Sequence, residues 1–119
     1  TTGGILAAFA LDVVLVTVFA AIGRASHTEA VFAGLATTAG PFLAALVVGW
    51  LVSLAWRSPR AIVRTGIPVW IVTVAGGMIL RALSGQGVQV AFVIVATITL
   101  LVMLVGWRAI AALVGRRRR

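Results

Sequence analysis

Four long apolar runs, separated by short polar connections, make up almost the whole chain. They cover residues 3–23, 32–56, 67–83 and 88–114. A helix that crosses a bilayer needs roughly 20 apolar residues, and each run is close to that length. None of the runs alternates with a period of two residues, which argues against the strands of a membrane barrel. The pattern predicts an all-α polytopic membrane protein, an antiparallel bundle of four transmembrane helices in a single domain over residues 1–119.

The composition excludes several other classes. Of the 119 residues, 62% are hydrophobic and 10% are charged, against about 25% charged residues in a soluble domain. Such a chain lacks the polar residues that would cover a soluble enzyme. It has no Cys, so disulfides and cysteine-ligated metals are excluded, and we expect no cofactor. His27 and Glu29 are too few ligands for a metal site and belong to a solvated loop.

The basic residues indicate a lipid surface. All ten are Arg, and they give the chain a net charge of +8. Nucleic-acid-binding proteins spread such charge over a polar face, whereas here the arginines punctuate apolar runs and end the chain. We therefore expect the bilayer and its anionic headgroups as partners, and no nucleic acid. The residues assigned to headgroups are Arg57, Arg60, Arg64, Arg116 and Arg117.

The same residues predict the orientation. With four spans, the middle connection and both termini lie on one side, and that side carries eight of the ten arginines, Arg108 among them. The positive-inside rule places it in the cytoplasm, here of a prokaryotic plasma (inner) membrane. The four tryptophans fall toward the same ends of their runs and predict an interfacial belt. They are Trp50, Trp56, Trp70 and Trp107.

Asp12 is the most informative single residue, because it lies in the middle of the first apolar run. An acid at that depth costs at least ~2.5 kcal/mol and normally faces protein or water. Its helical neighbours are apolar, so its partner comes from another helix or the carboxyl is protonated. Arg81 is the candidate partner; alternatively Arg81 extends to headgroups or meets Glu29. Together with Thr73, these residues predict either an ion or proton site or a polar bond that only fixes packing.

Small residues predict close approach between helices. Gly40 and Gly49 each belong to a ridge of small residues at every fourth position, and Gly76 and Gly77 lie in the third run. Small residues at this spacing let two helix backbones come close within a membrane. The ridges are compatible with a homo-oligomer or with a place in a larger membrane complex.

The chain also resembles a family of small four-helix membrane proteins from actinobacteria and archaea, catalogued only as a domain of unknown function. The resemblance implies the four-helix topology and implies no reaction. It rests on Asp12, Gly23-Arg24, Gly40-Pro41-Phe42, Gly49-Trp50, Gly66, Trp70, Thr73, Gly76, Arg81, Phe92-Val93 and Gly106-Trp107-Arg108.

Two functions remain open from the sequence. The first, which we favour, is a non-enzymatic structural or accessory membrane subunit, because the chain has no catalytic constellation. The alternative is a small homo-oligomeric proton-coupled transporter or channel that uses Asp12. An enzyme acting on lipid ranks third, since Asp12, His27 and Glu29 do not converge on one depth.

Overall fold

The computed structural model describes residues 2–25, 31–85 and 88–117, and every regular element in these ranges is helical. They form four helical rods, which confirms the predicted all-α, four-helix fold. The first two rods are α1 (Thr2–Ala25) and α2 (Val31–Ser53), followed by the 3-10 turn η1 (Ala55–Arg57). The third rod is the π-helical turn η2 (Ile62–Gly66) with α3 (Ile67–Leu83). The fourth joins α4 (Val90–Leu100), the π-helical turn η3 (Leu101–Val105) and α5 (Gly106–Arg117).

Three of the rods are long and apolar enough to cross a membrane. These stretches are Thr2–Ile22, Ile62–Leu83 and Val90–Gly115, and α2 is apolar over Thr37–Ser53. All four rods also carry large apolar side chains on the outside of the bundle. Exposed apolar side chains of this kind are what the lipid-facing side of a membrane-spanning helix requires.

Helix ends differ from the prediction mainly around the middle connection. The second run was expected to stay helical to residue 56, but α2 ends at Ser53 because Leu54 takes a left-handed conformation with φ 52° and ψ 48°. After the short 3-10 turn η1, the third rod begins at Ile62, inside the connection expected between the second and third runs. The left-handed conformation usually falls to Gly or Asn, so Leu54 gives no local signal of the break.

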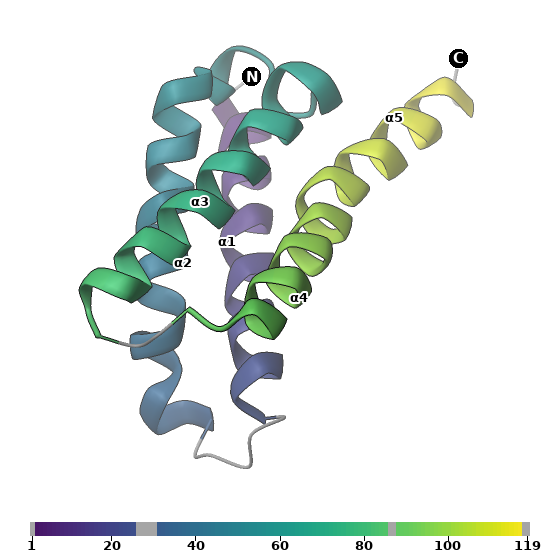
Figure 1. Ribbon diagram of the computed structural model, residues 1–119. Coiled ribbons are helices and arrows are strands. Elements are labelled where there is room, and N and C mark those ends of the chain that lie inside the picture. Colours follow the sequence, from purple (N-terminus) through teal and green to yellow (C-terminus); the bar gives the residue numbers. More distant parts are fainter. Residues whose placement is uncertain (1, 26–30, 86–87, 118–119) are drawn as a thin grey trace.

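The bundle is tightest among its first three rods (Figure 1). The most extensive packing is between α2 and α3, followed by that between α1 and α2, while α5 diverges from α1 toward its C-terminal end. The start of α1, the end of α5 and the connection between α2 and α3 lie at the same end of the bundle. We call this end the termini end.

Glycines form the seam between α2 and α3. A Cβ atom added at Gly76 would lie 2.9 Å from Cβ of Ala45, and one added at Gly77 would overlap the ring of Phe42. A Cβ at Gly49 would lie 3.4 Å from the Cα of Val69. These positions therefore give the close approach that small residues permit between membrane helices.

Gly40 does not take part in this seam. A Cβ added there would meet nothing within 4 Å in the part of the chain that the structure describes. Gly40 is half-buried and Ala44, one turn later, is exposed. Gly40 therefore makes no close approach to another helix within the described residues.

Candidate functional site

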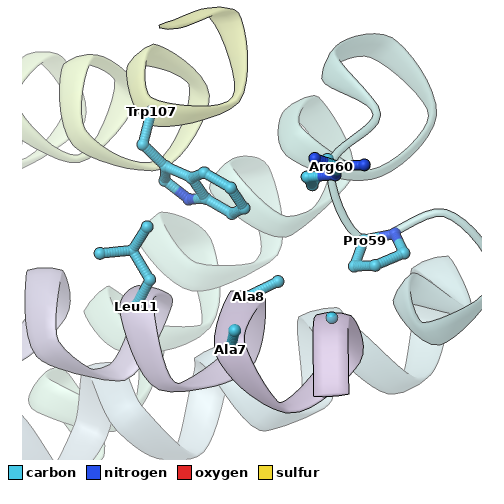
Figure 2. A pocket seen from close by; sticks show the side chains of 7 residues that line it. Ala7, Ala8, Leu11, Pro59, Arg60 and Trp107 are labelled. Carbon is cyan, nitrogen blue, oxygen red and sulfur yellow. The ribbon is translucent and has the colours of Figure 1, made fainter. Parts of the chain in front are cut away.

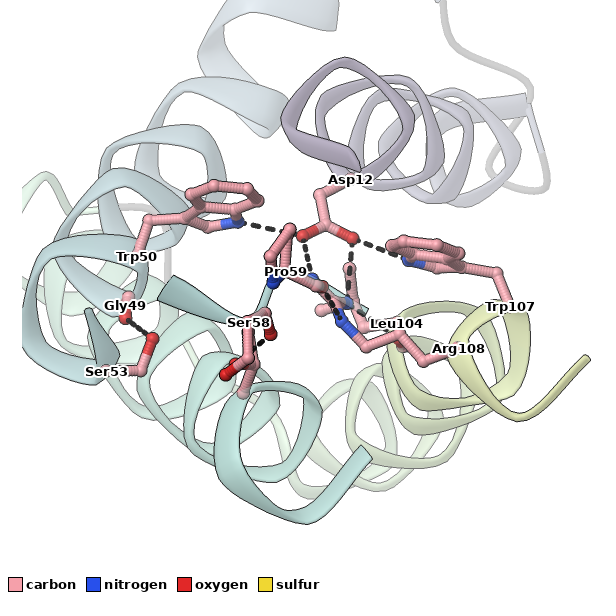
Figure 3. Close-up of polar contacts among 10 residues, drawn as sticks. Asp12, Gly49, Trp50, Ser53, Ser58, Pro59, Leu104, Trp107 and Arg108 are labelled. Atoms are coloured by element: carbon pink, nitrogen blue, oxygen red, sulfur yellow. Dashed lines mark hydrogen bonds and ion pairs between the residues drawn. The ribbon is translucent and has the colours of Figure 1, made fainter. Parts of the chain in front are cut away.

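The carboxylate of Asp12 lies in the interior of the bundle, with an exposed fraction of 0%. It projects from α1 toward α2, α5 and the middle connection (Figure 3). Its partners come from other helices, as the apolar surroundings on its own helix require.

Arg108 of α5 is the partner of Asp12. Its Nη2 lies 2.7 Å from Oδ2 of Asp12 and its Nη1 lies 3.0 Å from Oδ1. Both side chains are 0% exposed. This is the bidentate arrangement that the planar guanidinium makes with a carboxylate. The pairing expected with Arg81 is therefore wrong.

Two indoles complete the shell around the carboxylate. Nε1 of Trp50 donates to Oδ2 of Asp12 at 2.8 Å, and Nε1 of Trp107 donates to Oδ1 at 2.8 Å. Each oxygen thus accepts one bond from Arg108 and one from a tryptophan. Because indole N–H and guanidinium groups only donate, Asp12 acts purely as an acceptor here, which is the role of an ionised carboxylate.

Two further N–H donors of Arg108 are also used. Nε donates to the Pro59 carbonyl at 2.9 Å, and Nη1 donates to the Leu104 carbonyl at 2.8 Å. The guanidinium carbon lies 4.6 Å from the centroid of the Trp107 ring. Gly66 leaves room for the stem, since a Cβ there would lie 3.0 Å from Cδ of Arg108. We call Asp12, Trp50, Trp107, Arg108 and the Pro59 carbonyl the Asp12–Arg108 cluster.

Local backbone geometry positions this cluster. Trp107 and Arg108 are consecutive, yet both reach the same carboxylate. They lie two and three residues after the π-helical turn η3, which ends at Val105. A π turn shifts the register of the helix that follows it, and such turns are frequent at functional sites. On the other side, η1 and the segment after it bring the Pro59 carbonyl to Nε of Arg108.

The cluster connects three rods and the middle connection. Asp12 lies on α1, Trp50 on α2, Pro59 between η1 and η2, and Arg108 on the last rod. Lipid tails are as apolar as helix surfaces, so polar bonds and packing fix helix association in a membrane. Chemically, the arrangement holds these elements together, and each carboxylate oxygen of Asp12 already accepts two hydrogen bonds. The residues that the structure describes contain no group of acids or histidines that could hold a metal.

The other predicted site residues lie elsewhere. The Arg81 guanidinium carbon is 4.4 Å from the centroid of the Phe92 ring, near the opposite end of α3 from the middle connection. Thr73 is buried, and its hydroxyl has no hydrogen-bond partner within residues 2–25, 31–85 and 88–117. The structure thus does not bring Arg81 together with Asp12, and the predicted three-residue site does not form as one cluster.

The four tryptophans of the predicted belt differ in what their indole rings contact. Trp50 and Trp107 donate to Asp12, and Nε1 of Trp70 donates to the Thr97 carbonyl at 2.9 Å. Their indole nitrogens therefore serve acceptors within the bundle. Trp56 is 42% exposed, as an interfacial residue would be.

The arginines assigned to headgroups are placed only in part. Arg57, Arg60 and Arg64 are exposed at the termini end. Arg116 and Arg117 lie on the last turn of α5, and their side chains are outside the described part of the structure. His27 and Glu29 also lie outside the described residues.

Together these features define a class of protein. It is a bundle of four apolar helices with a buried ion pair near one end, and two tryptophans donate hydrogen bonds to that pair. The chain belongs to the family described as "Protein of unknown function (DUF3054)", which matches residues 9–111 and so includes both Asp12 and Arg108. This match confirms that the chain belongs to a family of unknown function. Neither the curated proteins nor the solved structures contain a match to this chain.

Proposed function

We propose that this protein is a multi-pass protein of a prokaryotic plasma (inner) membrane, with both termini in the cytoplasm. Three rods with the length and composition of membrane spans support this proposal. The excess of arginine at the termini end supports the orientation by the positive-inside rule. At that end, anionic headgroups would be contacted by Arg57, Arg60, Arg64, Arg116 and Arg117.

Within the membrane, the protein acts as a non-enzymatic structural or accessory subunit, in a homo-oligomer or a larger membrane complex. One observation carries this proposal: the Asp12 carboxylate accepts four hydrogen bonds from three side chains while it is fully buried. Such a group is suited to hold helices in place. It has neither a free oxygen nor an exposed surface at which to take up a cargo.

The alternative, a proton-coupled transporter that uses Asp12, requires this carboxylate to change its protonation state during each cycle. A proton carrier must exchange its proton with water in each cycle. Here protonation of Asp12 would require the bidentate bridge to Arg108 to open and would leave the buried guanidinium without its counter-ion, which is costly. The fully satisfied cluster therefore favours the structural role.

A flux assay separates the two functions. Purified protein in proteoliposomes would be given a pH gradient, and then a membrane potential, while an internal dye reports protons. We expect the flux to equal that of protein-free liposomes. A saturable flux in the wild type that is lost in Asp12→Asn but kept in Arg81→Gln would overturn the structural role and establish transport through Asp12. Cross-linking in native membranes then measures the size of the assembly.

A further inference from the structure

A groove of about 540 Å³ lies between α1 and α5 beside the Asp12–Arg108 cluster (Figure 2). Small side chains on α1 form one wall, and the ring of Trp107 on α5 faces them. The segment after η1 closes one end. The lining consists of Gly4, Ala7, Ala8, Leu11, Pro59, Arg60 and Trp107.

The groove has an apolar wall and a cationic mouth. Arg60 is the one charged residue in its lining, as far as the described residues show, and it is exposed. The neighbouring charges of Asp12 and Arg108 compensate each other and are fully buried. The whole chain has only two acidic residues, so the charge at the mouth is positive and complements that of an anion.

The size of the groove discriminates between occupants. One turn of an α-helix with its side chains is 10–12 Å across and 5.4 Å long, so it fills roughly 400–600 Å³. The groove therefore has room for no more than about one helical turn, and a second copy docked there would also bring a second Arg60 close by. A flexible hydrocarbon chain ending in an anionic group matches both the apolar wall and the charge of Arg60.

We propose that this groove binds one anionic phospholipid from the leaflet at the termini end, with the phosphate on Arg60 and an acyl chain between α1 and α5. The proposal rests on the membrane location proposed above. Trp107 links the groove to the interior, because its ring lines the groove while its Nε1 donates to Asp12. A bound lipid thus packs on the residue that caps the ion pair and stabilises the folded bundle by mass action.

Native mass spectrometry of the detergent-solubilised protein tests this inference. Phosphatidylglycerol is the probe, and phosphatidylcholine is the neutral comparison. We expect one phosphatidylglycerol per chain to be retained, with weaker retention of phosphatidylcholine. Arg60→Gln removes the mouth charge and should weaken phosphatidylglycerol binding about fivefold. Ala7→Phe fills the groove and should reduce binding of both lipids.

Arg81→Gln is the matched control, because it also removes one positive charge but Arg81 lies in the last turn of α3 and does not line the groove. It should leave retention of the single lipid unchanged. Equal losses in Arg81→Gln and Arg60→Gln would show that the effect depends on the total charge of the protein, and would overturn the site. Unchanged binding in Ala7→Phe, or a dimer that excludes lipid, would also overturn it. Because the measurement needs no flux, its failure is distinguishable from failure of the structural role.

Discussion

Asp12 raises an energetic question at the residue scale, because an acid among apolar helices is expensive to bury. Its desolvation is offset by charge-assisted bonds from Arg108 and by two indole donors. A buried ion pair is often no more stable than apolar residues of the same volume, whereas removing one partner is strongly destabilising. The cluster is therefore best understood as fixing one arrangement of helices.

The first prediction concerns the pairing itself. Asp12→Asn leaves the buried guanidinium of Arg108 without its counter-ion and should lower the free energy of unfolding by about 3–5 kcal/mol. Combining Asp12→Asn with Arg108→Gln removes both charges, so the double variant should be more stable than the sum of the two single losses by about 1–3 kcal/mol. Unfolding in mixed micelles with increasing dodecyl sulfate measures both effects.

Arg81→Gln provides the control for this cycle, since Arg81 contacts Phe92 instead of Asp12. Its effect should add to that of Asp12→Asn within about 0.5 kcal/mol. Strong coupling of Asp12 to Arg81, combined with additivity toward Arg108, would contradict the observed pairing.

A second prediction isolates the indole donors. Trp107→Phe keeps an aromatic ring but removes the N–H that donates to Oδ1 of Asp12. A hydrogen bond to a charged group contributes about 1.5–3 kcal/mol, and we expect a loss in that range in the same unfolding assay. Trp56→Phe is the comparison, because Trp56 is exposed. A loss as large in Trp56→Phe would show that ring size alone matters.

The sequence was sufficient to predict that Asp12 is buried but not which residue binds it. Arg108 was assigned to the helix end, and Trp50 and Trp107 to an interfacial belt. The distance of each residue from the end of its helix could have indicated the right partner. Asp12 lies ten residues after the start of α1 and Arg108 nine residues before the end of α5. At 1.5 Å per residue both are about 14–15 Å from the same end of the bundle, whereas Arg81 is near the other.

At the element scale, the seam between α2 and α3 depends on where a side chain is absent. Gly76 and Gly77 of α3 face Ala45 and Phe42 of α2. Apolar runs predicted the helices themselves, because length and hydrophobicity are enough to specify a span. They did not predict which small-residue ridge forms the seam, because that choice depends on how each helix is rotated in the bundle.

The third prediction tests this seam. Gly77→Ala places a methyl group where the Phe42 ring lies, so the ring or the helix must move. Overpacking of this kind typically costs 1–3 kcal/mol, and we expect a loss of about that size. Gly40→Ala should be neutral or slightly stabilising, because its added Cβ meets nothing within 4 Å and Ala is the better helix former. Equal losses in both variants would contradict the assigned seam.

The breaks in the helices were also beyond sequence reasoning. Leu54 ends α2 without a glycine, and η3 interrupts the last rod within an apolar stretch. Both breaks adjoin parts of the Asp12–Arg108 cluster. The first precedes the connection that contains Pro59, and the second precedes the start of α5, which carries Arg108. Tertiary contacts thus accompany these breaks, and a local pattern could not reveal them.

At the scale of the whole molecule, the fold places exposed positive charge at the termini end of the bundle. Exposed arginines of the middle connection lie at the same end as the start of α1 and the end of α5. Arg108, which the sequence analysis counted toward this bias, is neutralised by Asp12. The orientation argument therefore rests on the exposed and terminal arginines alone.

The last prediction tests that orientation, and the absence of native Cys makes it direct. Arg57→Cys places a single thiol in the middle connection, and Ser84→Cys places one in the connection between α3 and α4; both positions are exposed. Because the arginine-rich end should stay in the cytoplasm, a membrane-impermeant maleimide applied to intact cells should label Ser84→Cys and leave Arg57→Cys unlabelled. Permeabilised cells should label both, which controls for thiol reactivity. Labelling of Arg57→Cys in intact cells, with protection of Ser84→Cys, would place the termini outside and invert the proposed topology.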